Sequence, residues 1–316
     1  MYYTNYIIMR NVCILSSLTH HLECAAYLLE IFKEDSVMFC IRPQSDNAGY
    51  IEFYTSIYKN LTVISIEHPH INIVTVNDIC IKLTSADDKF LMHEKIVPIL
   101  HVKEAVEKFP GQNYLTLSPY VKHERAHYLF PVYKPPLVSR PPEKKVILVG
   151  YYPPDSFDGD TLEFIRMNHD YLFEFCVGPS GRTNCEIEKY DRMEDGLLNL
   201  YVCRELLSMT ELAERIRTAK FVLGKKWKYT CHDRFSGQLS LAMSYQKPLL
   251  IDKQTKEDYN LPGFQYDGEN YCTIGPLREI DDEKYNNVVE EIRTFNDTTL
   301  QRNKDMMCTI IEKTTQ

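Results

Sequence analysis

The stretch from His232 to Asp252, HDRFSGQLSLAMSYQKPLLID, places Ser236 and Gly237 directly before an apolar run with helical spacing. The start of a helix offers unpaired backbone N–H groups and a partial positive charge, and glycine lets a ligand approach the backbone. A lysine cluster, KKWK at positions 225–228, lies just upstream, and its charge suits a diphosphate. Without a ligand, Ser236 would be a simple N-cap and the lysines a solvated turn. With one, the pattern predicts a phosphate-binding turn.

The elements that would position this turn alternate along the second half of the chain. Strands are predicted at 144–152, 172–181, 198–206, 221–224 and 248–252. Ser208 and Glu211 have the spacing of a capping box, which predicts a helix after Ser208. Short strands that alternate with helices indicate a parallel sheet covered on both faces. Ligands of such sheets bind at the carboxyl ends of the strands, where the lysine cluster and Ser236 are expected to lie.

The first half of the chain shows the same alternation less clearly. Strands are predicted at 11–18, 36–42 and 61–68, and helices at 21–33 and 50–58. From Tyr133 to Lys145 the chain carries four prolines within eight positions, a composition typical of a linker. We therefore expect an α/β protein with two Rossmann-like lobes and a cleft between them. The predicted domains are 1–135, 136–280 and a C-terminal segment, 281–316, with helices near 283–294 and 298–312.

Amino-acid composition restricts the partners and the cellular compartment to be expected. The net charge of −8 disfavours a nucleic-acid partner, because such proteins need a basic face. The sequence contains no run of roughly 18 apolar residues, the length that a transmembrane helix requires, so none is predicted. The 10 cysteines form no C-x-x-C pair, which favours reduced thiols and a cytoplasmic protein. Richness in Lys, Asn, Ile and Tyr suggests an AT-rich genome, such as that of a large DNA virus or a protist.

The ordered motifs of the second half resemble the donor domain of GT-B type glycosyltransferases. They are VILVGYY (146–152), FCVGPSG (175–181), ELLSMTELAERIRTAKFVLGKK (205–226) and DRFSGQLSLAMSYQKPLLID (233–252). The resemblance implies a nucleotide-diphosphate-sugar donor held by the C-terminal lobe. The acceptor, a hydroxyl of a glycan, lipid or protein, would face the N-terminal lobe. No metal or cofactor is expected beyond this co-substrate.

The resemblance and the lysine cluster together assign donor contacts to strand ends and to the turn before the apolar helix. These residues are Gly150, Tyr151, Gly178, Ser180, Lys225, Lys226, Phe235, Ser236, Gly237 and Gln238. Asp233, the acidic residue of that turn, is expected to bind the sugar hydroxyls. One position departs from the family: retaining members of a large branch carry a second glutamate, which grips the ribose, where this chain has Leu241.

Thr19, His20 and His21 follow the first predicted strand and form the expected acceptor side. Some inverting GT-B enzymes place a catalytic histidine there, and a histidine pKa near neutrality suits proton removal from a hydroxyl. We expect His20 to be the base in a direct displacement of a hexose. The alternative is that both histidines merely begin a helix.

Three other functions remain open from the sequence. A sugar-nucleotide epimerase of the same fold would need no acceptor, and a nonenzymatic sugar-nucleotide binder would turn nothing over. More remotely, His123-Glu124-Arg125-Ala126-His127 matches the H-E-x-x-H signature of zinc proteases. That signature requires a helix with both histidines on one face.

Overall fold

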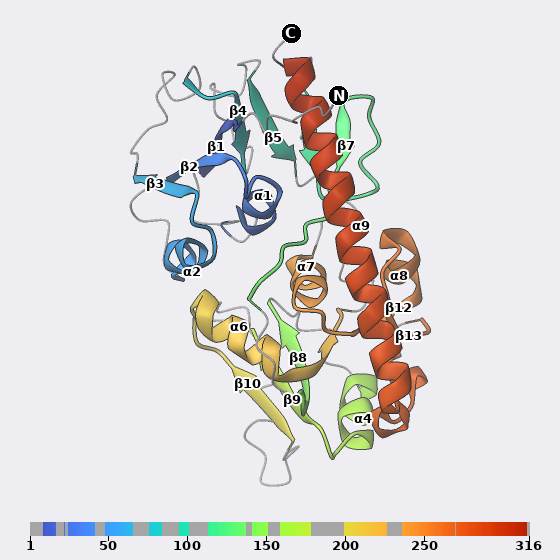
Figure 1. The fold of residues 1–316 in the computed structure, drawn as a ribbon. Coiled ribbons are helices and arrows are strands. Elements are labelled where there is room, and N and C mark those ends of the chain that lie inside the picture. The colour runs from blue at the N-terminus through green and yellow to red at the C-terminus, as the bar shows by residue number, and fades with distance from the viewer. Residues whose placement is uncertain are drawn as a thin grey trace, which may run out of the picture. The chain divides into compact units, whose positions relative to one another are not determined.

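A computed structural model describes residues 9–16, 22, 25–41, 48–65, 76–83, 95–100, 113–136, 141–150, 159–177, 199–225, 236–268 and 270–314. The chain divides into two compact units (Figure 1). The N-terminal unit comprises Met1–Tyr133 and Leu300–Gln316, and the C-terminal unit comprises Lys134–Thr299. Each unit is a parallel sheet with helices, so the predicted α/β class with two Rossmann-like lobes is confirmed.

The sheet of the N-terminal unit is parallel throughout its described strands. The strands are β1 (Asn11–Ser16), β2 (Ser36–Ile41), β3 (Leu61–Ser65), β4 (Ile79–Lys82), β5 (Ile96–Leu100), β6 (Tyr114–Thr116) and β7 (Ala126–Tyr128). Their order is β3-β2-β1-β4-β5-β6-β7. Two helices accompany the early strands, α1 (Ala25–Ile31) and α2 (Tyr50–Ile57). Central β1 is buried beyond its first residue, as a strand flanked on both sides and covered on both faces must be.

The C-terminal unit repeats this plan with a second parallel sheet. Its strands are β8 (Glu143–Val149), β9 (Leu172–Cys176), β10 (Leu200–Cys203), β11 (Ala219–Leu223), β12 (Leu249–Asp252) and β13 (Gly263–Tyr266), in the order β10-β9-β8-β11-β12-β13. Helices α4 (Gly159–Met167), α6 (Met209–Thr218), α7 (Gly237–Ser244) and α8 (Lys253–Tyr259) connect them. Two 3₁₀ turns, η6 (Tyr271–Ile274) and η7 (Leu277–Glu279), follow β13.

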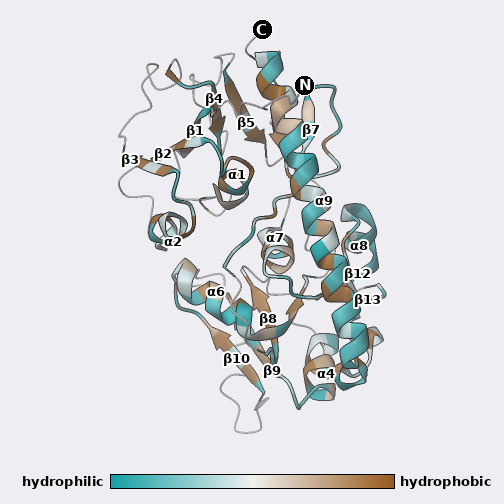
Figure 2. Cartoon of the chain, viewed as in Figure 1, coloured by the Kyte–Doolittle hydropathy of each residue, from teal (hydrophilic) through white to brown (hydrophobic). Residues whose placement is uncertain are grey.

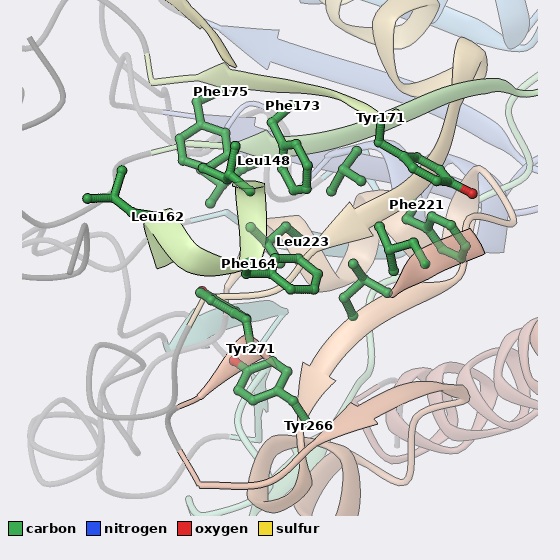
Figure 3. Close-up of a cluster of buried hydrophobic side chains, with 14 of the residues drawn as sticks. Leu148, Leu162, Phe164, Tyr171, Phe173, Phe175, Phe221, Leu223, Tyr266 and Tyr271 are labelled. Atoms are coloured by element: carbon green, nitrogen blue, oxygen red, sulfur yellow. The ribbon is translucent and has the colours of Figure 1, made fainter. Parts of the chain in front are cut away.

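The two faces of this second sheet differ because side chains alternate along each strand. Val146 and Leu148 lie on the face that packs with Phe164 of α4 into an aromatic-rich cluster (Figure 3). Lys145 and Glu174 lie on the opposite face, where their charged atoms approach to 3.2 Å. Arg215 of α6 also pairs with Glu174, so a buried charged group lies on the face that α6 covers, beside the apolar residues Met209, Ala213 and Ile216 of that helix.

The predicted capping box is confirmed at the start of α6. Ser208 Oγ accepts the backbone N–H of Glu211 at 3.2 Å, and the Glu211 carboxylate accepts the backbone N–H of Ser208 at 2.8 Å. This backbone hydrogen bond lowers the pKa of Glu211. Both free N–H groups are thereby satisfied at a point that the sequence spacing identifies.

The C-terminal segment departs from the prediction of two helices. A single helix, α9, runs from Asp282 to Thr314, because no proline or glycine interrupts this stretch. Figure 2 shows hydrophilic and hydrophobic residues mixed along its length. Among the residues that the structure describes, no helix is both long and apolar enough to cross a membrane.

Candidate nucleotide-sugar site

The strand order of the C-terminal unit locates a candidate site. The chain moves outward from β8 through β9 to β10, and later strands lie on the other side, beginning with β11. Parallel sheets bind ligands at the carboxyl ends of the two strands where the order reverses. Here β8 ends at Val149 and is followed by Gly150. Its neighbour β11, about 4.8 Å away, ends at Leu223 and is followed by Gly224 and Lys225.

Gly150 forms the end of β8 in a conformation that favours glycine. Its φ is +89°, in a region that L side chains rarely adopt, and its N–H donates to the carbonyl of Cys176 at 2.9 Å. A Cβ placed on Gly150 would lie 3.8 Å from Lys225 Nζ. The structure therefore brings together two predicted donor contacts that are 75 positions apart in the sequence.

Lys225 is half-buried at the end of β11. Burial lowers its pKa to about 8, and no carboxylate of the described residues offsets this effect. A desolvated amino group at a strand end is stabilised as a cation when an anionic ligand binds beside it.

The start of α7 is joined to the same strand end. Ser236 occupies the N-cap position, but its side chain makes no capping hydrogen bond, so the reading of Ser236 as a simple side-chain cap is not supported. Gly237 has no described atom within 4 Å of the place that a Cβ would occupy. Gln238 is 4% exposed, and its Nε2 donates to the carbonyl of Leu223. Its Oε1 is buried and makes no hydrogen bond within the described structure.

The other predicted site residues lie outside the described residues. They are Thr19, His20, His21, Tyr151, Gly178, Ser180, Lys226, Asp233 and Phe235. The base on the acceptor side and the acidic residue for the sugar remain predictions.

Sequence reasoning missed two tyrosines of this site, Tyr266 and Tyr271. The Tyr271 hydroxyl donates to the carbonyl of Gly224 at 3.0 Å, and the Tyr266 hydroxyl to that of Lys225 at 3.4 Å. The chain has 22 tyrosines, and no spacing distinguishes these two from ordinary core aromatics. Only the folded strand order brings them to β11.

The H-E-x-x-H match is not a zinc-protease helix. His127 lies on strand β7, and His123 lies in the turn before it. His123 Nδ1 accepts the N–H of Arg125 at 3.2 Å, and His127 Nε2 lies 3.3 Å from Asn113 Oδ1. The N–H of Ala126 donates to the carbonyl of His123 at 3.0 Å and closes this turn, so the two histidines do not share one face of a helix, as the signature requires. Within the described ranges, no group of three or more metal-ligating side chains comes together.

Comparisons with known proteins agree on the fold. No protein-family model matches the chain, and no curated protein matches it in sequence. Among solved structures, HepE (Alr3699) of Anabaena in complex with UDP and glucose matches with a TM-score of 0.60 at 11% identity, covering 95% of this chain and 99% of HepE. HepE with UDP alone gives 0.53 at 9% identity, covering 95% and 100%.

The lipopolysaccharide outer core galactosyltransferase WaaB, in its apo form, matches with a TM-score of 0.50 at 11% identity, covering 93% of this chain and 98% of WaaB. At such identities the likeness defines the fold. The chain has the GT-B architecture of nucleotide-sugar glycosyltransferases over nearly its whole length.

Proposed function

We propose that the chain is a glycosyltransferase that moves a hexose from a nucleotide-diphosphate-sugar to a hydroxyl of a glycan, lipid or protein. The observation that carries the proposal is the meeting of Gly150, Lys225 and the start of α7 at the carboxyl ends of β8 and β11. A cation and unpaired helix N–H groups suit a diphosphate there. The HepE structure of the same fold holds UDP and glucose, which favours UDP as the carrier.

The proposed reaction is a direct displacement at the anomeric carbon. The acceptor oxygen forms a bond to that carbon while the bond to the diphosphate oxygen breaks, and His20 takes the acceptor proton. Lys225, Lys226 and the start of α7 stabilise the negative charge that the departing diphosphate gains. Asp233 binds the sugar hydroxyls. The nucleotide sugar is the only co-substrate that this scheme requires.

Turnover of UDP-sugars tests the proposal. UDP-glucose, UDP-galactose and UDP-N-acetylglucosamine are incubated with the chain, with and without glycan and lipid acceptors, and free UDP and the glycosylated product are measured. We expect acceptor-dependent release of UDP, lost in His20→Ala and retained in the matched control His123→Ala. Conversion of the donor without an acceptor would indicate an epimerase instead. Binding without turnover under all conditions would contradict the proposal.

A further inference from the structure

The backbone that carries Lys225 is held by two buried tyrosines. Tyr271, on η6, donates its hydroxyl to the carbonyl of Gly224 at 3.0 Å, and Tyr266, the last residue of β13, reaches the carbonyl of Lys225 at 3.4 Å. Both side chains are fully buried, and their ring centroids lie 4.8 Å apart in an edge arrangement. Figure 3 shows them side by side in the apolar cluster.

The residues before Lys225 are fixed as well. The N–H of Gly224 donates to the carbonyl of Leu250 on β12 at 2.8 Å, and a Cβ on Gly224 would lie only 2.9 Å from that oxygen. Gln238 of α7 occupies the carbonyl of Leu223. Three successive carbonyls at the end of β11 thus each accept a hydrogen bond from a different element: α7, η6 and β13.

This arrangement has a consequence for the lysine side chain. A desolvated amino group gains free energy by turning out into water, so a loosely held backbone would let it leave the site. A fixed backbone keeps the Lys225 Cα within reach of Gly150 before any ligand arrives, and so limits the positions that its amino group can take. Binding then costs less conformational entropy, because the group is already ordered.

We propose that Tyr266 and Tyr271 are positioning residues, which hold Lys225 at the carboxyl edge of the sheet so that its amino group receives the diphosphate of the sugar-nucleotide donor. The inference rests on the proposed function. It adds to that function two residues that touch the lysine backbone and not the substrate.

Calorimetric titration with UDP tests this role. The double variant Tyr266→Phe/Tyr271→Phe removes two hydroxyls and keeps the rings, and we expect it to bind UDP about fivefold more weakly. In a Lys225→Met background the same two substitutions should leave the affinity for UDP unchanged, because the group that they position is gone.

The chain offers a matched control in Tyr285, a third tyrosine of the same cluster. Its hydroxyl donates to the carbonyl of Lys220 at 3.3 Å, on the same strand β11 at its opposite end. Tyr285→Phe should lower thermal stability as the other substitutions do, and leave UDP affinity unchanged. A merely structural role of Tyr266 and Tyr271 predicts equal effects of all these hydroxyls.

The outcomes separate this inference from the function beneath it. Absence of UDP binding by the unsubstituted chain would contradict the proposed function with UDP as its carrier. The positioning role alone would be overturned if the tyrosine double variant bound UDP as tightly as the unsubstituted chain. It would also be overturned if the two tyrosine substitutions weakened UDP binding by the same factor in the Lys225→Met background.

Discussion

Lys225 and Lys247, two lysines of the C-terminal unit, have depressed pKa values, with different consequences. For Lys225 the cause is burial, and its pKa of about 8 lies within reach of ordinary buffers. The cation that the proposed diphosphate site requires is therefore present below pH 8 and is lost as the pH rises through that value. A diphosphate bound beside it would raise the pKa of Lys225 in turn, so the proposal links binding to protonation.

We accordingly expect the affinity for UDP to fall about tenfold more between pH 7 and pH 9 in the unsubstituted chain than in a variant with a permanent charge at position 225, which shares any titration of UDP itself. Lys225→Met should bind roughly 10- to 100-fold more weakly at pH 7 and show no such fall. Lys225→Arg, which keeps its charge across this range, should bind at both pH values. A fall of equal size in the arginine variant would assign the titration to another group.

Lys247 affects stability and not the site. It lies two residues before β12 and is 9% exposed. Burial is the larger cause, and repulsion from Lys145 the smaller, that lowers its pKa to about 8. Between pH 8 and the usual value of 10.5 the unfolded chain holds a proton that the folded chain has lost. Stability therefore rises with pH across this window, and the full cost of the buried charge is present below pH 8.

Replacing Lys247 by methionine should remove this cost. Urea unfolding at pH 7 is expected to show Lys247→Met more stable by up to about 3 kcal/mol, with the advantage nearly gone at pH 10.5. The pH series removes effects of side-chain packing, which do not titrate. An advantage that is the same at both pH values would contradict the assignment to the buried charge.

Among the elements of the candidate site, the glycine that begins α7 and the glycine that follows β11 differ in whether the fold requires a glycine. Gly237 has open space around the place of a Cβ and no positive φ, so nothing in the described fold requires glycine there. Gly224, by contrast, leaves no room for a Cβ beside the carbonyl of Leu250. The absence of a side chain at Gly237 is consistent with access for a ligand, and at Gly224 with close packing between strands.

This difference gives opposite predictions for two alanine variants. Gly237→Ala should leave the free energy of unfolding unchanged or raise it by up to about 1 kcal/mol, and yet weaken UDP binding, because the methyl group occupies the approach to the helix start. Gly224→Ala should lower the free energy of unfolding by about 1–3 kcal/mol. Urea denaturation and calorimetry measure the two properties. A Gly237→Ala protein with unchanged UDP affinity would remove α7 from the site.

Sequence patterns identified some elements better than others for physical reasons. Buried apolar runs predicted β1, β2, β8 and β12, and the capping box predicted the start of α6, because both signals are local. Strands β6 and β7, three residues each, are too short to show a period of two. The literal H-E-x-x-H match fell on β7, where pairing with β6 and not local propensity decides the conformation.

The site was predictable to a similar degree. The resemblance assigned Gly150 to donor binding, and the lysine cluster and the helix entry assigned Lys225 and the start of α7, so these residues were predicted; Gly150 and Lys225 follow the two strands at which the order reverses. Tyr266 and Tyr271 were not, because their role depends on contacts between β11 and elements about 40 positions later. Contacts between residues so far apart produce no recognisable pattern of residue spacing in a single sequence.

At the scale of the whole molecule, two parallel sheets on one chain follow from the alternation of strands and helices in both halves, with prolines between them. The C-terminal unit contains its own sheet, core cluster and candidate site. We therefore propose that this unit binds the donor. The proposal assigns the acceptor and the catalytic base, His20, to the N-terminal unit.

Calorimetric titration with UDP, GDP, CDP and ADP measures whether this chain binds a nucleotide diphosphate, on which the proposed function depends. We expect saturable binding of one nucleotide diphosphate per chain, strongest for UDP, and at 100 times the dissociation constant a gain in stability of about 2.7 kcal/mol. Absence of binding by all four nucleotides would contradict the account, whatever the fold resembles.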